Sequence, residues 1–406
     1  MKFPLEIFED QKNKDKLEEL LKEGLCDNCL GRQFGMLGHG MTNKERGEIL
    51  REFAGKKESE TCKLCGNFFK GQIDKVANDI SKKLGGMEYE TFLIGSIPSD
   101  EVARKQDELW EKFGIDNVEP IKAEINREVG KRVEKLAGKS FSLKNPDVTA
   151  VIDMKKNELR LMVRSLFVGG GYKKLVRGIP QSKWVCLKCG GKGCVNCEGM
   201  GQLYPTSVQE IAEKPLLKAT GAKKSKFSAA GREDIDARCL DWRPFVLELI
   251  RPLKRKIDLK KLEKQVNKSK KVQVKGLKVV ADKGVVRNLK ATKADKTYLA
   301  EVKFANKVDL KKLKEIRKFT KEPILQKTPI RVVHRRADIC RKRAVRSITY
   351  QVVDDKTVMF KIRGESGLYI KELIYGDEGR TTPNVAAVIG NKVKKISLDV
   401  IKIWTK

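Results

Sequence analysis

Residues 232–238, read as Arg-Glu-Asp-Ile-Asp-Ala-Arg, bring three acids and two arginines together directly after a glycine. Carboxylates at this density can supply a nucleophile or a charge that stabilises a transition state. A solvated, salt-bridged turn explains the same composition. For an arbitrary sequence the turn is the better interpretation, so the segment needs support from the rest of the chain.

The cysteines give a second chemical signal, because eight of the ten form four CxxC pairs. The first two pairs have the spacing CxxC-x32-CxxC. Zinc prefers four tetrahedral thiolates, and each CxxC turn can supply two of them. Four cysteines close the coordination shell, so we expect a structural zinc and not a catalytic one, with the ligands Cys26, Cys29, Cys62 and Cys65.

The other two pairs form an internal repeat with a period of eight, CLKCGGKG followed by CVNCEGMG. This repeat resembles the cysteine-rich knuckles of DnaJ-type chaperones. A second structural zinc is possible here; the alternative is a flexible glycine-rich hairpin whose thiols bind metal weakly. The ligands would be Cys186, Cys189, Cys194 and Cys197.

Apolar periodicity indicates the elements that must position these residues. Helical spacing of apolar residues predicts helices over 11–23, 43–54, 73–84 and about 121–136, and alternation predicts strands near 89–94, 148–154 and 159–163. From residue 245 onward short alternating strands dominate, with one helix near 309–318. The lysine-rich segment over 214–227 is predicted to be a linker. This order predicts an α/β unit followed by a mixed α+β sheet domain.

The chain is strongly basic, with 87 Lys and Arg against 54 Asp and Glu and a formal net charge of +33. Proteins of heat-loving organisms are also rich in charge, but with balanced signs. The excess therefore favours a nucleic-acid partner. No apolar run is long enough to span a membrane, and the charged N-terminus lacks the apolar middle of a signal peptide. We expect a cytoplasmic protein.

Four segments together resemble the pseudouridine synthases of the Pus-ten family, found in archaea and eukaryotes. GREDIDAR, followed by RPFVLEL, is similar to the family's catalytic motif, and the first cysteine quartet also matches. The other matching segments are RSLFV…YKKLVRGIPQSKW (164–184), QKTPIRVVHRRADICRKR (326–343) and GESGLYIKELIYGDEGRTTPNV (364–385). The resemblance covers most of the chain.

The resemblance implies roles for three catalytic residues. Asp234 takes the position of the essential aspartate, which attacks or stabilises while uracil is cut from ribose, rotated and rejoined through carbon. Tyr298 matches the tyrosine that packs on the target base, and Lys371 matches the basic residue that pairs with the aspartate. Asp236, two residues further in an extended segment, would point the other way. Expected substrate contacts are Arg232, Arg238, Tyr369, Arg335 and Arg336.

The resemblance also implies the substrate and the domain plan. The substrate is tRNA, modified at uridine 55 and often also 54 of the T-loop, with no organic cofactor and no obligatory protein partner evident. The expected fold class is α+β: a zinc-binding and THUMP α/β module, then a mixed antiparallel catalytic sheet flanked by helices. The expected domains are a zinc-binding segment with the first cysteine quartet (1–70), a THUMP-like RNA-binding domain (71–184), a zinc knuckle (185–203) and the catalytic domain (204–406).

Rival functions predict other features. A THUMP-bearing methyltransferase should carry a glycine-rich cofactor loop after a strand, and a thiouridine synthetase should carry an SGGxDS loop; the sequence has neither. A non-catalytic tRNA-binding protein with a THUMP domain would keep the fold but could lose the catalytic set. Since Asp234, Tyr298 and Lys371 are all present, the enzyme is the preferred interpretation.

Overall fold

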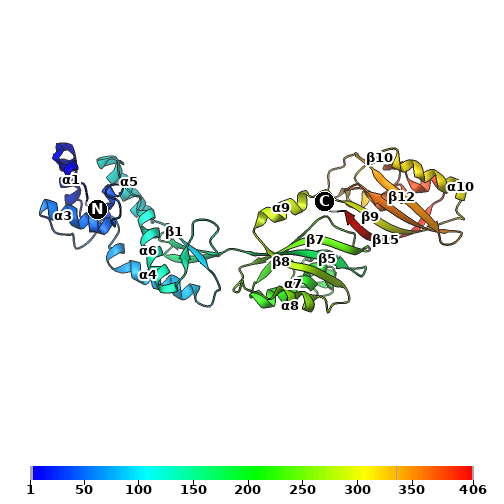
Figure 1. The fold of residues 1–406 in the computed structure, drawn as a ribbon, viewed down its shortest axis with the longest axis horizontal. Coiled ribbons are helices and arrows are strands. Elements are labelled where there is room, and N and C mark those ends of the chain that lie inside the picture. Colours follow the sequence, from blue (N-terminus) through cyan, green and yellow to red (C-terminus); the bar gives the residue numbers. More distant parts are fainter. Residues whose placement is uncertain (1–2, 335, 405–406) are drawn as a thin grey trace. The chain divides into compact units, whose positions relative to one another are not determined.

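The chain passes between two structural units more than once. The first unit contains Met1–Arg164 and the short return segment Leu253–Arg255, and the second contains Ser165–Pro252 and Lys256–Lys406. The return segment is bonded into the first unit, where the amide of Glu88 donates to the Leu253 carbonyl over 2.7 Å. The computed structural model describes residues 3–334 and 336–404 (Figure 1).

The first unit begins with short helices around the first cysteine quartet. Helix α3 starts with a capping box, in which Thr42 and Glu45 bind each other's backbone amides, and it ends at Gly55 in the left-handed region. The helices of this part are η1 (Leu5–Glu9), α1 (Gln11–Lys22), α2 (Asp27–Gly31), η2 (Arg32–Phe34), α3 (Asn43–Ala54) and η3 (Phe68–Gln72).

The rest of the first unit is a four-stranded sheet in the order β2-β1-β3-β4. Helix α6 packs on β1, and α4 packs beside α6 (Figure 1). Their inward faces carry the apolar residues that periodicity predicted, including Ile80 and Ile125, both buried. The elements are α4 (Ile73–Leu84), β1 (Thr91–Ile97), α5 (Asp100–Phe113), α6 (Ile121–Ala137), β2 (Ser140–Phe141), β3 (Val148–Asp153) and β4 (Glu158–Val163).

The second unit is built on one large mixed sheet, in the order β12-β13-β9-β15-β7-β5-β8, with β6 also paired to β7. All neighbours are antiparallel except β15 and β7. The expected α+β fold class, with a mixed sheet flanked by helices, is confirmed. The strands are β5 (Leu166–Lys174), β6 (Lys224–Ala229), β7 (Arg238–Ile250), β8 (Val272–Val280), β9 (Asp295–Phe304), β12 (Val345–Val352), β13 (Thr357–Gly364) and β15 (Val393–Trp404).

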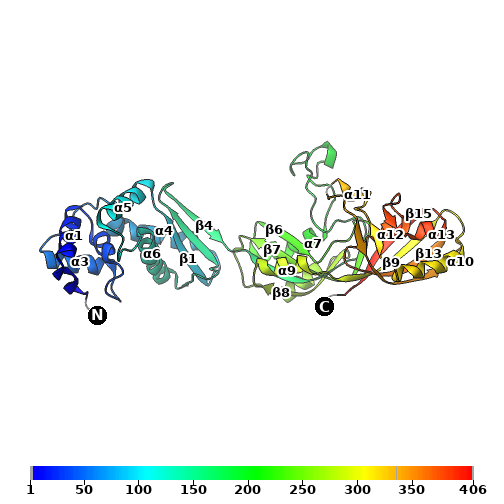
Figure 2. The same ribbon diagram turned by 90° about the horizontal axis from the view of Figure 1, so that it is seen from above.

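Helices and a small sheet flank the large sheet. A three-stranded sheet has the order β11-β10-β14, and a glycine-rich excursion that carries the second cysteine quartet projects from the unit (Figure 2). These elements are η4 (Val195–Cys197), α7 (Val208–Thr220), α8 (Leu259–Val266), α9 (Lys283–Ala291), α10 (Leu310–Leu313), η5 (Lys314–Thr320), β10 (Ile324–Gln326), α11 (Ile330–Val333), β11 (Arg341–Arg343), α12 (Ile370–Tyr375), β14 (Thr381–Thr382) and α13 (Val385–Ile389).

Two expectations differ from the structure. The expected linker over 214–227 is wrong: it forms the second half of α7 and most of β6. Its lysines lie outside, while Leu216 is 2% exposed and belongs to the core. In addition, residues 165–184 lie in the second unit, because β5 pairs with β7 and β8 along its length. No described helix has both the length and the apolar character needed to cross a lipid bilayer.

Candidate active site and metal centres

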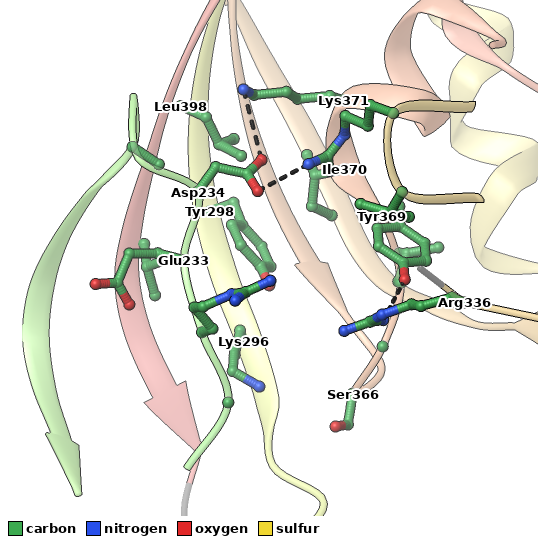
Figure 3. Close-up of a pocket in the computed structure, with 18 residues that line it drawn as sticks. Glu233, Asp234, Lys296, Tyr298, Arg336, Ser366, Tyr369, Ile370, Lys371 and Leu398 are labelled. Atoms are coloured by element: carbon green, nitrogen blue, oxygen red, sulfur yellow. Dashed lines mark hydrogen bonds and ion pairs between the residues drawn. The ribbon is translucent and has the colours of Figure 1, made fainter. Parts of the chain in front are cut away.

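A cavity of about 270 Å³ lies beside the loop that joins β6 to β7. The loop contributes Asp234, and strand β9 contributes Lys296 and Tyr298 from one face, because their spacing of two points both side chains the same way. Figure 3 shows Tyr298 beside Asp234 and Lys296 further along the same strand. The structure therefore brings the expected aspartate, tyrosine and Lys371 to one cavity.

Two cations bind the Asp234 carboxylate. Nη1 of Arg331 lies 2.8 Å from Oδ1, and Nζ of Lys371 lies 3.5 Å from Oδ2 (Figure 3). The Arg331 Nε also lies 2.6 Å from the carboxylate of Glu372, which is 1% exposed. Burial alone would lower the pKa of Arg331, but Glu372 and Asp234 outweigh it and raise that pKa. Arg331 thus stays charged next to Asp234.

Lys371 lies closer to Asp236 than to Asp234. Its Nζ is 2.8 and 2.7 Å from the two Asp236 oxygens. The expectation that Asp236 points the other way is wrong, because the segment is turned and not extended: the Ala237 amide donates to the Asp234 carbonyl over 3.1 Å. Burial raises the pKa of Asp236, but the Lys371 ammonium outweighs burial and leaves that pKa below its ordinary value. One lysine therefore serves two carboxylates.

The third acid of the loop, Glu233, belongs to the lining of the cavity, but its side chain is buried in the protein. Its carboxylate lies 3.0 Å from Nε of Arg243, and both side chains are fully inaccessible. The Tyr172 hydroxyl donates to the same carboxylate over 3.0 and 3.1 Å. A buried charge is tolerated when it is paired and hydrogen-bonded in this way. Glu233 anchors the loop, which leaves Asp234 as the acid that faces the cavity.

The aromatic and amine groups of β9 have shifted pKa values. Burial raises the pKa of Tyr298 to about 12. Burial, with the nearby Arg243 guanidinium, lowers the pKa of Lys296 to about 8. At neutral pH Tyr298 therefore keeps its hydroxyl proton and presents a neutral ring, which suits stacking on a base.

The five expected substrate contacts fall in different places. Arg232, Tyr369 and Arg336 line the cavity, and Arg336 donates to the Tyr369 hydroxyl over 2.7 Å. Arg238 instead binds Asp399 through two nitrogens, at 3.0 and 2.6 Å, so it braces the start of β7. Arg335 lies outside the described residues.

Sequence reasoning missed Arg331, Glu372 and Lys296. Arg331 lies inside the QKTPIRVVHRR segment, yet nothing local indicates that it reaches a carboxylate 97 positions away. Lys296 could have been found, since it precedes Tyr298 by two residues in an alternating strand.

The first cysteine quartet is part of the main core of the first unit. All four thiols are buried, and the four Sγ atoms lie within 4.8 Å of one another. The Sγ atoms of Cys26 and Cys65 are 3.7 Å apart, which agrees with the roughly 3.8 Å between thiolates 2.3 Å from one tetrahedral zinc. The inaccessible Arg32 donates to Cys29 Sγ over 3.2 Å and to Glu124 over 2.9 Å. This donor set fits a metal ion.

The second quartet has the same geometry in a more open setting. Its Sγ atoms also lie within 4.8 Å of one another, and three of the Sγ–Sγ distances between these free thiols are 3.8 to 3.9 Å. The amides of Gly193 and Gly201 donate to Cys189 and Cys197 over 3.3 and 3.2 Å. Donors aimed at the sulfurs stabilise thiolates, so this quartet also fits a metal ion.

Family models match most of the described chain. One described as "Pus10, C-terminal" matches residues 167–404, and one described as "Pus10 THUMP domain, archaeal" matches residues 76–153. The mixed sheet and these two matches place the chain among the pseudouridine synthases that also carry a THUMP domain.

Curated relatives agree in name. Proteins called "tRNA pseudouridine synthase Pus10" include one from Methanopyrus kandleri, 39% identical over 96% of this chain and 98% of its own length. Those from Methanothrix thermoacetophila and Pyrococcus furiosus are each 37% identical, over 93% and 96% of this chain and 91% and 97% of their own lengths. The chain belongs to the Pus10 family.

Among solved structures, a Cbf5-Nop10-Gar1 complex aligns with a TM-score of 0.32 and 16% identity, over 58% of this chain and 50% of that chain. This similarity is too low to bear on the site.

Proposed function

We propose that this chain, a tRNA pseudouridine synthase by its family, isomerises uridine 55 of the T-loop and takes uridine 54 as a second target. The observation that carries the proposal is the Asp234 carboxylate, which faces the cavity between Arg331 and Lys371 at 2.8 and 3.5 Å. The two cations hold the Asp234 carboxylate at the cavity, where it can act as a nucleophile or as a charge that stabilises the transition state.

The reaction is an isomerisation that balances without an oxidant or a second substrate. The bond between ribose C1′ and uracil N1 breaks, a bond between C1′ and C5 forms, the C5 proton is lost and N1 gains a proton. Asp234 either attacks carbon or stabilises the positive charge that develops on ribose. Because electrons are neither gained nor lost, no organic cofactor is needed.

The target nucleotide must leave its stack to reach Asp234. Tyr298 then stacks on the exposed base, an interaction worth about 1–3 kcal/mol. Arg232 and Arg336, which line the same cavity, can bind the phosphates on either side of that nucleotide. These groups position the base, and Asp234 acts on it.

The first unit and the charge of +33 support binding of the rest of the tRNA by the THUMP domain and by lysines along the backbone. We propose that the protein acts in the cytoplasm, where thiols stay reduced, and without an obligatory protein partner. Activity of the purified chain alone tests the last point.

We also propose that both cysteine quartets bind structural zinc. The ligands would be Cys26, Cys29, Cys62 and Cys65 in the first unit, and Cys186, Cys189, Cys194 and Cys197 in the excursion. Zinc there would cross-link chain segments and would leave no open position for substrate.

The test is tritium release from a T-loop tRNA transcript labelled at uracil C5, with wild type, Asp234→Asn and Asp282→Asn compared. Asp282 is an exposed cap of α9 outside the cavity. Release by wild type and Asp282→Asn, but not by Asp234→Asn, is expected, and mapping the product separates position 55 from 54. If tRNA binds but no protein releases tritium, the chain is a non-catalytic tRNA-binding protein.

A further inference from the structure

A buried lysine binds the backbone of the loop that carries Asp234. Lys174, the last residue of β5, is 0% exposed. Its Nζ donates to the carbonyls of Ile179, Asp234 and Ile235 over 3.0, 2.9 and 3.2 Å. An ammonium group has three donors, so these carbonyls use all of them, and two belong to the loop that presents the catalytic carboxylate.

Neighbours of Lys174 bind the same loop. Nη1 of Arg177 donates to the Asp236 carbonyl over 2.8 Å, and the Gly178 amide donates to the Ile235 carbonyl over 2.9 Å. Nε2 of Gln181 donates to the Gly231 carbonyl over 3.0 Å. The segment 174–181 thus binds the three consecutive carbonyls of residues 234–236 and the carbonyl of Gly231.

This arrangement is energetically demanding. Burial lowers the pKa of Lys174, and Glu233 opposes that shift only partly. Among the described residues Lys174 has hydrogen bonds to carbonyls alone and forms no ion pair. A buried cation without a paired carboxylate lowers stability unless its hydrogen bonds compensate. An apolar side chain would avoid the cost of a buried cation but would take one donor from each of the three carbonyls. The lysine therefore fixes the backbone of the loop at the cost of its own burial.

We infer that Lys174, at the start of the segment 174–181, is a positioning residue that orients the Asp234 peptide and thereby aims its carboxylate into the cavity. This inference rests on the proposed function. Arg331 and Lys371 bind the side chain of Asp234, and Lys174 binds its backbone carbonyl. Displacing a reacting group by about 1 Å can slow a reaction about 100-fold.

The experiment compares wild type, Lys174→Met and Lys173→Met in the full-length protein. Lys173 is the matched control, because it is the adjacent lysine of β5 but lies 4.5 Å from the Trp242 ring and does not bind the loop. Tritium release under single-turnover conditions at saturating protein reports the chemical step. Filter binding of the same transcript reports tRNA affinity, and thermal melting reports folding.

Lys174→Met is expected to lower the single-turnover rate constant about 100-fold with tRNA affinity within about 3-fold of wild type, and Lys173→Met to leave the rate constant unchanged. The inference is overturned if Lys174→Met folds and keeps the wild-type rate constant. This holds whether its tRNA affinity is unchanged or reduced. If Lys174→Met does not fold, Gln181→Leu decides: a rate constant about tenfold lower at unchanged affinity is expected, and an unchanged rate constant overturns the inference. Absence of release by the wild type would instead reject the proposed function.

Discussion

Nη1 of Arg331 lies 2.8 Å from Oδ1 of Asp234. The same guanidinium binds Glu372, so the Asp234 carboxylate is connected to a buried acid on α12 through one arginine. Because Arg331 comes from α11 and Asp234 from the β6–β7 loop, this contact joins two walls of the cavity.

Arg331→Leu should impair both reaction and stability. It removes one of the two cations at Asp234 and leaves Glu372 buried without its partner, which should lower the free energy of unfolding by about 1–2 kcal/mol, since Arg331 is itself partly solvated. Single-turnover tritium release and chemical denaturation measure the two effects. Arg331→Lys keeps the charge and should lose less of each. Wild-type values for Arg331→Leu in both assays would contradict the role given to this contact.

Asp236→Asn should distinguish the two acids that share Lys371. Lys371 would lose its closer partner, at 2.7 Å, and keep Asp234, at 3.5 Å. Since Asp234 remains, the rate of tritium release should stay within about tenfold of wild type, whereas Asp234→Asn should abolish the release. An equal loss in both variants would show that Asp236 takes part in the reaction.

Lys296 should make stability rise with pH between about 8 and 10.5. The pKa of Lys296 is about 8 in the folded protein, against an ordinary 10.5. In this window the unfolded chain binds the proton and the folded chain does not, so ∂ΔG/∂pH of unfolding gains a positive contribution and folding is favoured as pH rises. Lys296→Met should remove that slope and stabilise the protein at pH 7 by up to about 3 kcal/mol.

Urea denaturation of wild type and Lys296→Met at several pH values tests this prediction. The quantity compared is the difference between their free energies of unfolding at each pH. Lys303→Met, which changes an exposed lysine of the same strand, is the control and should keep the slope. A slope that persists in Lys296→Met would assign it to another group.

Loss of the proposed zinc should lower the melting temperature by different amounts at the two cysteine quartets. The first quartet is part of the main core of its unit, while Leu187 and Val195 beside the second are 94% and 97% exposed. Cys29→Ser should therefore lower the melting temperature strongly, and Cys194→Ser only slightly, each with loss of one zinc per chain. Elemental analysis and thermal melting measure this, with exposed Cys340→Ser as control. Two zinc ions retained in Cys194→Ser would refute the second site.

Local patterns predicted the elements well where apolar spacing was regular. The helix over 43–54 has the predicted bounds, and the cysteine spacing predicted both quartets that come together. Residues 165–184, which include β5, were placed with the preceding unit through the family resemblance of segment 164–184. Gly169, Gly170 and Gly171 interrupt the apolar alternation that would have indicated a strand of the second sheet. In the structure these glycines allow close packing: a Cβ on Gly170 would lie 2.9 Å from Leu277.

Long-range contacts are the part that the sequence could not supply. Asp234, Tyr298 and Lys371 were named through family motifs, and the structure places all three at one cavity. Arg331 and Glu372 were missed because their pairing depends on how α11 and α12 fold back together, 41 positions apart. The Asp234 and Ile235 carbonyls bound by Lys174 lie 60 and 61 positions along the chain, beyond any local pattern.

The return of Leu253–Arg255 to the first unit means that no single cut in the chain separates the two units. A fragment that stops after Arg164 lacks the Leu253 carbonyl that Glu88 binds and the Arg255 guanidinium, 3.6 Å from Asp147. A fragment that starts at Ser165 carries that tripeptide without its partners. Neither fragment therefore contains all the contacts of its own unit. The two fragments should be more soluble when they are expressed together than when each is expressed alone.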